Sequence, residues 1–472
     1  MTRRTKIVCT LGPSSSSAEV IEALMNAGMD VARINFSHAD LETHARTIRT
    51  VREVADRLER PVAILGDLQG PKIRVGALAE PVELRPGDEW TFAPEGEHQP
   101  GELPTTYPDL AHDVETGDVV LLADGLMELI VEETKGDRAR MRVIHGGTLT
   151  SHKGINLPGV KLSVPSLTAK DERDLAFALE QGLDYVALSF VREASDVVRL
   201  KEQIPEDGPP VVVKIEKGMA LQNLRSILEV SSAAMVARGD LGVELPFEQV
   251  PLAQKRMIQL CNLTSRPVIT ATQMLESMIE NPRPTRAEAS DVANAIIDGT
   301  DAVMLSAETA AGKFPVEAVK AMVRIAEEIE RSHIIDTGPH YDMVVEPEEA
   351  GATPTEWAIA AATVEAVRRI DAPLIVTFTQ TGFTARVVSS FRPPVPILAL
   401  TDDPRTYRQL ALVWGVVPVM LSPSLTFDET LDFARRCARE RELASAGDRI
   451  VVTAGLPIHT SGTTNFLRVE KV

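Results

Sequence analysis

The stretch Val211-Val-Val-Lys214-Ile-Glu216 is an apolar run of strand length that carries two charged residues at its end. Side chains alternate between the two faces of a β-strand, so Lys214 and Glu216 lie on one face. Runs rich in Val and Ile are typical of parallel strands that are buried on both sides. The stretch therefore predicts a buried parallel strand with a lysine and a carboxylate at its carboxyl end.

Similar short runs recur over the first two thirds of the chain and alternate with amphipathic stretches. Helical patterns follow at 40–60, 285–298 and 315–332. Eight such strand–helix units predict an α/β fold in which the strands close into a (β/α)₈ TIM barrel. The predicted strands are 5–11, 30–36, 62–67, 184–190, 210–215, 233–238, 267–272 and 301–306.

Residues 70–166 have a different sequence pattern, in which segments of alternating apolar and polar residues are separated by Pro-Gly, Asp-Gly and Gly-Gly pairs. This pattern predicts a small, antiparallel β-barrel lid domain inserted after the third strand. Without it, residues 1–69 and 167–338 remain, close to the ~250 residues typical of a TIM barrel.

The last part of the chain resumes the alternation after a Pro- and Glu-bearing linker near 339–353. We predict helices at 355–370, 383–391 and 404–414, and strands at 373–379, 395–400 and 416–420. Residues 339–472 are therefore expected to form an open α/β domain.

Composition excludes several kinds of partner. The 472 residues include 49 Lys plus Arg against 68 Asp plus Glu, a formal net charge of −19. Such a chain lacks the basic surface that binds nucleic acid or anionic membranes, and no apolar run approaches the ~18 residues of a membrane span. Cys9, Cys261 and Cys437 fit neither a disulfide framework nor a metal motif, so we expect reduced core thiols and a cytoplasmic protein.

Polar residues recur at the carboxyl ends of the predicted barrel strands, where the active sites of such barrels lie. Lys214 and Glu216 end one strand, and Asp240 follows the next, behind Gly239. Two carboxylates beside a lysine, without Cys or clustered His, form an oxygen site suited to Mg²⁺ or Mn²⁺ rather than zinc. A structural ion pair at the strand end is the alternative for Lys214 and Glu216.

Two arginines would suit a phosphorylated, anionic substrate. Arg33 and Arg74 offer bidentate forks for phosphate, and Gly239 leaves room for backbone amides to approach a carboxylate. Each arginine alone could equally be a solvated surface side chain. Their agreement with the metal residues favours the phosphate hypothesis.

Several longer strings, in the correct order, resemble the pyruvate kinase family across essentially the whole chain. The resemblance implies the barrel, lid and C-terminal regulatory domain, and phosphoryl transfer from phosphoenolpyruvate to ADP to give pyruvate and ATP. It also implies an allosteric homotetramer. The strings are Ile7-Val-Cys-Thr-Leu-Gly-Pro-Ser, Arg33-Ile-Asn-Phe-Ser-His, Val213-Lys-Ile-Glu, Ala237-Arg-Gly-Asp-Leu-Gly-Val-Glu, Ala271-Thr-Gln-Met-Leu-Glu-Ser-Met and Asp298-Gly-Thr-Asp-Ala-Val-Met-Leu-Ser-Ala-Glu-Thr.

Matching motifs assign roles to individual residues. By resemblance, Glu216 and Asp240 hold the divalent cation, and Lys214 stabilises the transferring phosphoryl group. Arg33 binds phosphate, amides near Gly239 and Asp240 bind the substrate carboxylate, and Thr272 lies near the carbon that receives a proton. The positions matching the family's nucleotide site are Asn35, Phe36, Ser37, His38, Arg74 and Lys153.

One departure from the family pattern concerns potassium. The family's common Asp-Thr-Lys-Gly-Pro-Glu-Ile-Arg here reads Asp67-Leu-Gln-Gly-Pro-Lys72-Ile-Arg74. The Lys72 ammonium could supply the positive charge that K⁺ provides in relatives with the glutamate, so we predict that K⁺ is not required. The counter-evidence is that the K⁺ ligands of the family are retained, namely Asn35, Ser37, Asp67 and the Leu68 carbonyl.

A second motif lies in the C-terminal domain. Thr379, Thr381, Gly382 and Thr384 resemble the family's effector-phosphate loop, although a simple helix cap would look similar. The later loop from Gly455 to Thr464 lacks the Trp and Arg that bind the second phosphate of fructose-1,6-bisphosphate in activated relatives. We therefore expect a singly phosphorylated effector, such as AMP or a hexose monophosphate.

Two rival functions stay open at this point. Metal-dependent aldolases and lyases also bind pyruvate-like groups through Glu, Asp and a cation, but would not need a nucleotide-closing lid with Arg74 and Lys153. A metabolite sensor that lost its chemistry would not need Lys214, Glu216 and Thr272. ADP-dependent formation of pyruvate from phosphoenolpyruvate with Mg²⁺ separates all three.

Overall fold

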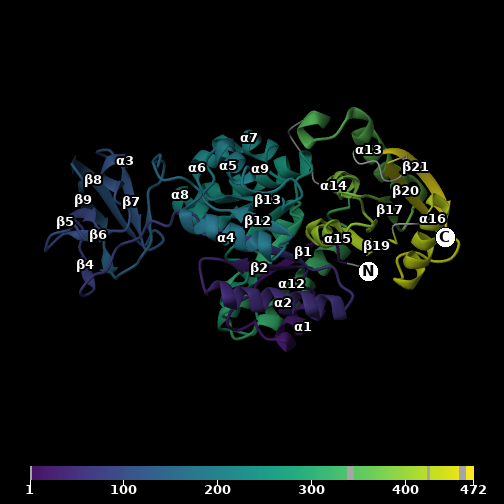
Figure 1. The fold of residues 1–472 in the computed structure, drawn as a ribbon, viewed down its shortest axis with the longest axis horizontal. Helices are drawn as coiled ribbons and strands as arrows, with labels where there is room; N and C mark the ends of the chain where they lie inside the picture. The colour runs from purple at the N-terminus through teal and green to yellow at the C-terminus, as the bar shows by residue number, and fades with distance from the viewer. Residues whose placement is uncertain (1–2, 337–344, 423–425, 456–463) are drawn as a thin grey trace.

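The computed structural model describes residues 3–336, 345–422, 426–455 and 464–472. Figure 1 shows three bodies in a row, with the barrel in the middle, the inserted β domain on one side and the C-terminal domain on the other. Among the described residues, no helix is long and apolar enough to cross a membrane.

The barrel is closed and all its strand pairs are parallel, in the order β1-β16-β15-β14-β13-β12-β3-β2, which confirms the predicted TIM barrel. Every strand is almost wholly buried, which is why its residues form continuous apolar runs. The strands are β1 (Lys6–Thr10), β2 (Val31–Asn35), β3 (Ala63–Asp67), β12 (Tyr185–Leu188), β13 (Val211–Ile215), β14 (Ala233–Ala237), β15 (Val268–Ala271) and β16 (Ala302–Leu305).

Helices surround the barrel, and side chains fix where several of them begin. Thr285 caps α10 in a reciprocal bond with Glu288, and Asp40 accepts a bond from the Thr43 amide at the start of α2. These caps explain why both helices begin one residue after the predicted start. The helices are α1 (Ala18–Ala27), α2 (Leu41–Arg57), α4 (Ala169–Glu180), α5 (Ala194–Lys201), α6 (Gly218–Gln222), α7 (Leu224–Glu229), α8 (Arg238–Glu244), η1 (Phe247–Gln249), α9 (Val250–Leu263), η2 (Glu276–Ile279), α10 (Arg286–Ile297), α11 (Ala307–Ala310) and α12 (Pro315–Arg331).

The inserted domain has a core of its own and consists of a six-stranded sheet, β11-β7-β8-β9-β5-β6, and a two-stranded sheet, β10-β4. The prediction of antiparallel pairing fails at one place, since β5 and β6 are parallel because the intervening chain crosses back before β6 begins. The elements are β4 (Val82–Leu84), β5 (Glu89–Pro94), β6 (Leu103–Thr105), α3 (Leu110–Asp113), β7 (Val119–Leu122), β8 (Met127–Lys135), β9 (Arg138–His145), β10 (Gly147–Leu149) and β11 (Ile155–Asn156).

The C-terminal domain is an open sheet in the order β19-β18-β17-β20-β21, in which the edge strand β21 runs antiparallel to the others. The helix predicted at 404–414 is shorter than expected and continues as a 3₁₀ turn, η4. The elements are η3 (Pro347–Ala350), α13 (Pro354–Ile370), β17 (Ile375–Phe378), α14 (Phe383–Ser390), β18 (Ile397–Thr401), α15 (Pro404–Gln409), η4 (Leu410–Leu412), β19 (Val416–Met420), α16 (Phe427–Glu440), β20 (Arg449–Gly455) and β21 (Thr464–Lys471).

The η4 turn closes the amino-terminal end of the barrel. Ala411 and Leu412 are buried in one cluster with the inward-facing side chains of the barrel strands, such as Val8, Val31 and Leu65. The neighbouring Gln409 carbonyl accepts a bond from the Tyr185 hydroxyl at 2.9 Å. Burial of Ala411 and Leu412 against the barrel side chains accounts for the end of α15 at Gln409.

Buried ion pairs also join the two domains. The Arg392 guanidinium donates to both carboxylate oxygens of Asp301, at 3.1 and 3.0 Å, and both side chains are 4% exposed. Asp301 also accepts bonds from the backbone amides of Val268 and Trp414. We call these residues the base cluster, because they lie at the amino-terminal end of the barrel strands.

Candidate active site

A cavity of about 120 Å³ opens at the carboxyl ends of the barrel strands. Lys214 and Glu216 reach it from β13, Asp240 from the first turn of α8, and Thr272 from the end of β15. The predicted residues that line this cavity are Arg33, Asn35, Ser37, Leu68, Lys72, Lys214, Glu216, Asp240 and Thr272.

The Lys214 ammonium lies among three oxygen partners. It is 2.7 Å from a Glu216 oxygen, 2.7 Å from the Ser189 hydroxyl and 3.4 Å from an Asp67 oxygen. The second oxygen of Glu216 accepts a bond from the Phe190 amide at 2.7 Å. We call Lys214, Asp67, Glu216 and Arg33 the mouth cluster.

Charges within the mouth cluster oppose the effect of burial on the pKa values of Lys214 and Asp67, but only partly on that of Glu216. Burial would lower the pKa of Lys214, but Asp67 and Glu216 outweigh it and raise that pKa above the ordinary lysine value. Burial would raise the pKa of Asp67, but Lys214 and Arg33 lower it. Burial raises the pKa of Glu216 and Lys214 only partly offsets this, because Asp240 adds a second negative charge. The Asp67 and Glu216 carboxylates therefore favour a charged ammonium at the wall of the cavity.

Arg33 is fixed on the opposite side of Asp67. Its Nε and one Nη contact the same Asp67 oxygen, at 2.8 and 2.6 Å, and its other Nη donates to the Thr10 hydroxyl at 2.9 Å. Since the guanidinium is held on both edges, it presents a fixed positive charge to the cavity.

Thr272 occupies a left-handed backbone conformation, with φ at +66°, which is costly for a β-branched residue. Its hydroxyl accepts a bond from the Gly239 amide at 2.7 Å and donates to the Ala271 carbonyl at 2.6 Å. The strained backbone therefore turns the hydroxyl toward the start of α8. The Gly239 amide, predicted to bind a carboxylate, is engaged by Thr272 in this structure.

The donor set of the cavity fits a hard divalent cation. Glu216 and Asp240 present carboxylate oxygens to one space, and no group of three or more His, Cys, Asp or Glu side chains with metal-binding geometry occurs in the described part of the chain. Two protein carboxylates would leave the remaining positions to substrate oxygens and water, as Mg²⁺ prefers.

Lys72 lines the same cavity and makes no ion pair among the described residues. Burial of its ammonium, followed by repulsion from Lys214, lowers the pKa of Lys72. Three of the four residues that match the family's K⁺ ligands are already engaged. The Asn35 amide oxygen accepts from the Ser37 amide, the Leu68 carbonyl accepts from Ser189, and Asp67 holds Arg33.

The structure does not bring all of the predicted nucleotide residues to the cavity. The Phe36 ring is buried against His44 and Phe177, and its carbonyl accepts a bond from Lys170. His38 is exposed, and burial, followed by the charge of Lys72, lowers its pKa. Arg74 and Lys153 lie on the two facing chains that lead into the inserted domain, where Arg74 donates to the His152 carbonyl at 2.9 Å.

Two serines in the cavity were given no role by the sequence prediction, although Ser306 stands at the predicted end of the eighth strand. Ser189 follows β12, is 1% exposed, and bridges Lys214 to the Leu68 carbonyl, 2.7 Å from each. Ser306 follows β16, and its buried hydroxyl has no hydrogen-bond partner among the described residues. Both lie at the carboxyl end of a barrel strand, which is the same signal that identifies Lys214 and Glu216.

The effector residues run from the end of β17 into the first turn of α14. Gly382 precedes α14 with φ at +75°, and the Thr384 hydroxyl contacts the Thr464 hydroxyl at 2.7 Å. Thr379 is buried and Thr381 is exposed. Most of the loop from Gly455 to Thr464 lies outside the described residues.

Comparisons with known proteins agree with this architecture. Residues 2–319 match the family model for the pyruvate kinase barrel domain, and residues 357–470 match that for the pyruvate kinase alpha/beta domain. The chain is 48% identical over 482 residues to pyruvate kinase 2 of Synechocystis, covering 100% of this chain and 79% of that protein. It is 45% identical to the pyruvate kinase of Geobacillus stearothermophilus, covering 100% and 81%.

A solved structure gives the same answer. The crystal structure of a pyruvate kinase from Cryptosporidium parvum superposes with a TM-score of 0.90 at 37% identity, covering 99% of this chain and 96% of that one. Strand order, cavity residues and full-length similarity lead to one conclusion. The chain belongs to the pyruvate kinase family, whose members are phosphotransferases.

Proposed function

We propose that the mouth cluster catalyses transfer of the phosphoryl group from phosphoenolpyruvate to ADP, the pyruvate-forming step of glycolysis. The observation that carries this proposal is the Lys214 ammonium, which is held by Asp67, Glu216 and Ser189 at the wall of the cavity. Phosphoryl transfer spreads negative charge over three equatorial oxygens, so a fixed cation at that point stabilises the transition state.

The other residues have roles that follow from their positions. Arg33, held by Asp67 and Thr10, binds a phosphoryl oxygen of the substrate. Glu216 and Asp240 would hold a Mg²⁺ or Mn²⁺ ion, which would supply positive charge to neutralise the anionic substrate. Thr272 stands beside the Gly239 amide, where its hydroxyl orients the proton donor for the enolate of pyruvate.

ADP is proposed to enter from the side of the inserted domain. Asn35 and Ser37 line the cavity itself, whereas Phe36, His38, Arg74 and Lys153 lie outside it. Movement of the inserted domain toward the barrel would bring Arg74 and Lys153 to the nucleotide phosphates. Alanine variants of these two residues are expected to raise the KM for ADP more than that for phosphoenolpyruvate.

One assay tests the proposed reaction. ADP-dependent pyruvate formation from phosphoenolpyruvate should require a divalent cation, and chelation with EDTA should abolish it. Pyruvate formed without ADP would point to a lyase. Binding of metabolites without turnover at any effector concentration would point to a sensor protein.

We also propose that turnover does not require K⁺. The support is the Lys72 ammonium in the cavity, together with the engagement of Asn35, Leu68 and Asp67 by other protein groups. Activity should be equal in K⁺ and in a large, non-binding cation at matched ionic strength, whereas Lys72→Glu should gain K⁺ dependence. Strong activation of the unaltered enzyme by K⁺ contradicts the proposal.

Regulation is proposed to act through the loop of Thr379, Thr381, Gly382 and Thr384. A strand end, a glycine with positive φ and a helix start together make a cradle for phosphate. We expect AMP or a hexose monophosphate to shift the phosphoenolpyruvate saturation curve, and Thr384→Val to weaken that shift. A response to fructose-1,6-bisphosphate alone contradicts this expectation.

A homotetramer in the cytoplasm is the proposed form of the enzyme. Phe247 and Leu252, around the start of α9, are 85% and 69% exposed, which suits coverage by another copy. Cys9, Cys261 and Cys437 are free and buried, in keeping with a reducing compartment. Light scattering of the unaltered enzyme and of Phe247→Asp tests the assembly, and a monomeric unaltered enzyme refutes it.

A further inference from the structure

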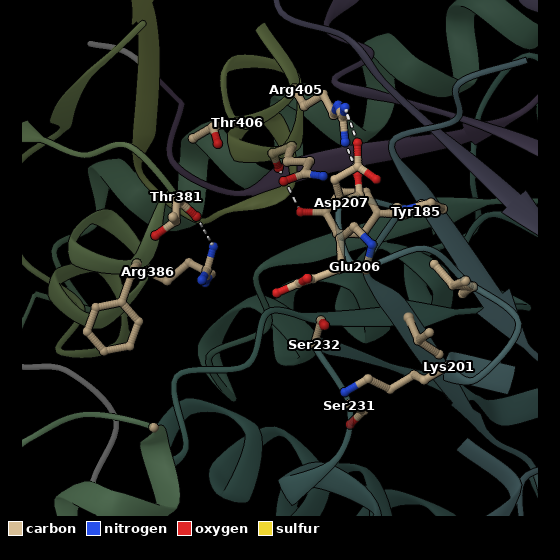
Figure 2. Close-up of a pocket in the computed structure, with 18 of the residues that line it drawn as sticks. Tyr185, Lys201, Glu206, Asp207, Ser231, Ser232, Thr381, Arg386, Arg405 and Thr406 are labelled. Carbon is tan, nitrogen blue, oxygen red and sulfur yellow. Dashed lines mark hydrogen bonds and ion pairs between the residues drawn. The ribbon is translucent and has the colours of Figure 1, made fainter. Parts of the chain in front are cut away.

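A second and larger cavity, of about 920 Å³, lies between the base of the barrel and the C-terminal domain (Figure 2). One wall comes from loops before β13, β14 and β15 of the barrel, and the other from α14, α15 and the preceding loops. Pockets of this size hold a metabolite rather than a single ion. None of the mouth-cluster residues lines this cavity.

Arg386 projects into this cavity from α14 (Figure 2). One of its Nη atoms donates to the Thr381 carbonyl at 3.0 Å, and no carboxylate pairs with the guanidinium in the described parts of the chain. Burial lowers the pKa of Arg386, and no described carboxylate offsets that effect. Its remaining N–H groups are therefore available to an acceptor in the cavity.

Arg266 lines the cavity from the barrel side and is also without a carboxylate partner among the described residues. Its guanidinium donates to the backbone carbonyls of Leu228, Ser231, Thr264 and Glu349. Burial is the main cause that lowers the pKa of Arg266; Cys261 opposes this effect, repulsion from Arg386 adds to it, and Glu229 opposes it least. The two cations therefore act on each other across the domain boundary.

The acids near this pair, including Glu229 beside Arg266 and Asp403 on the cavity wall, form no ion pair with either arginine among the described residues. A narrow pocket of about 10 Å³ joins Arg266 and Arg386 to Asp301, but both oxygens of Asp301 are bound by Arg392. On the barrel wall, Asp207 pairs with Arg405 at 3.0 Å, and Glu206 is exposed. Partly buried guanidinium groups without counter-ions are unfavourable unless an anion completes the site.

We propose that this interdomain cavity binds a small phosphomonoester, with its phosphate held by Arg386 and Arg266. A phosphomonoester carries about two negative charges near neutral pH, which balances two guanidinium groups. Its oxygens can accept bonds from the Arg266 Nη that bonds no carbonyl among the described residues and from the N–H groups of Arg386 that Thr381 leaves free. Glu206 and Ser232 lie across the cavity from Arg386 (Figure 2), where they can accept bonds from hydroxyl groups on the body of the ligand. Because the arginines belong to different domains, the ligand bridges the barrel and the C-terminal domain.

This cavity adjoins the proposed effector loop and shares Thr381 with it, but it does not include Thr379 or Thr384. Thr384 faces Thr464 on the other side of α14, within the C-terminal domain, and does not line the cavity. Thr381 contributes to the cavity wall and binds Arg386 through its backbone carbonyl. A side-chain substitution at Thr384 should therefore leave the interdomain site intact.

Calorimetric titration of the full chain with ribose 5-phosphate, and with inorganic phosphate as the minimal probe, tests the proposal. Arg386→Met and Arg266→Met should each weaken ribose 5-phosphate binding about tenfold or more, the loss expected for charge-assisted hydrogen bonds. Arg405→Met is the matched control, because Arg405 lines the same cavity but is paired with Asp207. Both Arg405→Met and Thr384→Val should retain the wild-type affinity.

Thermal unfolding guards against a variant that merely misfolds. Without phosphate, Arg386→Met should unfold at the same temperature as the wild type or higher, since it removes an uncompensated charge. Added phosphate should stabilise the wild type more than Arg386→Met. The proposal is overturned if neither probe binds the wild type, if Arg386→Met binds as the wild type does, or if Thr384→Val alone abolishes binding. The outcome does not depend on turnover, so it is independent of the proposed reaction.

Discussion

The mouth cluster and the base cluster are two buried groups of ion pairs at opposite ends of one barrel. In the base cluster, Asp301 receives two contacts from Arg392 and two backbone N–H groups, so its carboxylate is saturated by fixed donors. In the mouth cluster, Lys214 and Glu216 border an open cavity that a substrate and a cation can enter. Burial alone does not distinguish them.

The difference lies in whether the partners can be exchanged. A saturated pair holds two domains in one arrangement, and removal of either partner leaves an unpaired buried charge. A pair beside a cavity can release its charge to an incoming ligand without leaving any group unpaired. Lys214 and Glu216 also have a partner for each polar group, so we infer that access to an open cavity, where a ligand can replace these bonds, marks the catalytic cluster.

Of the substitutions in the two clusters, Lys214→Met is expected to have the largest effect. We expect kcat to fall by roughly 10³-fold, because the substitution removes the cation aimed at the transferring phosphoryl group. Steady-state kinetics measures the loss, and circular dichroism checks that the fold is retained. Lys313→Met, at an exposed pair with Glu280, is the control and should keep full activity. Near-normal turnover of Lys214→Met would remove Lys214 from the mechanism.

Arg392→Met tests the saturated cluster. It should lower the free energy of unfolding by about 3 kcal/mol, because Asp301 is left buried without its cation. Denaturant titration measures this loss. Arg369→Met breaks an exposed pair with Glu365 and should change stability by less than about 0.5 kcal/mol. If the two variants have the same free energy of unfolding, the bonds of the base cluster do not stabilise the fold.

Ser189→Ala gives the smallest expected effect and asks how far the mouth cluster depends on orientation. The hydroxyl bridges Lys214 and the Leu68 carbonyl, so its loss should let the ammonium move and lower kcat about tenfold, the value of one charge-assisted hydrogen bond. The KM for phosphoenolpyruvate should stay within about twofold, since Arg33 is untouched. Equal increases in KM with constant kcat would assign Ser189 to binding instead.

Much of the barrel was predictable from the sequence because its strands are buried on both faces. Such strands must be continuous apolar runs, and the polar residues that interrupt them must lie at the ends. This is why the sequence alone predicts that Lys214, Glu216 and Asp240 lie together. Their convergence on one cavity follows from parallel strand order rather than from any local motif.

The features that the sequence did not predict depend on contacts between distant segments. The left-handed backbone of Thr272 has no local signal, since Thr disfavours that conformation. The end of α15 is set by burial of Leu412 against the barrel. The interdomain cavity is lined by Arg266 from the barrel and by Arg386 from the C-terminal domain. Local propensity cannot specify any of these.

The position of the η4 turn in the sequence determines when, during translation, the amino-terminal end of the barrel can be covered. The first strand emerges from the ribosome with Lys6, yet the apolar residues that cover its end of the barrel, Ala411 and Leu412, are among the last to be made. The last barrel helix, α12, ends at Arg331, so about 80 further residues must be made before Leu412, which takes roughly 4–16 s at 5–20 residues per second. During that time the nascent barrel stands with its floor exposed. Binding of chaperones to the nascent chain should therefore be strongest late in translation, when the barrel is complete but Ala411 and Leu412 do not yet cover its amino-terminal end.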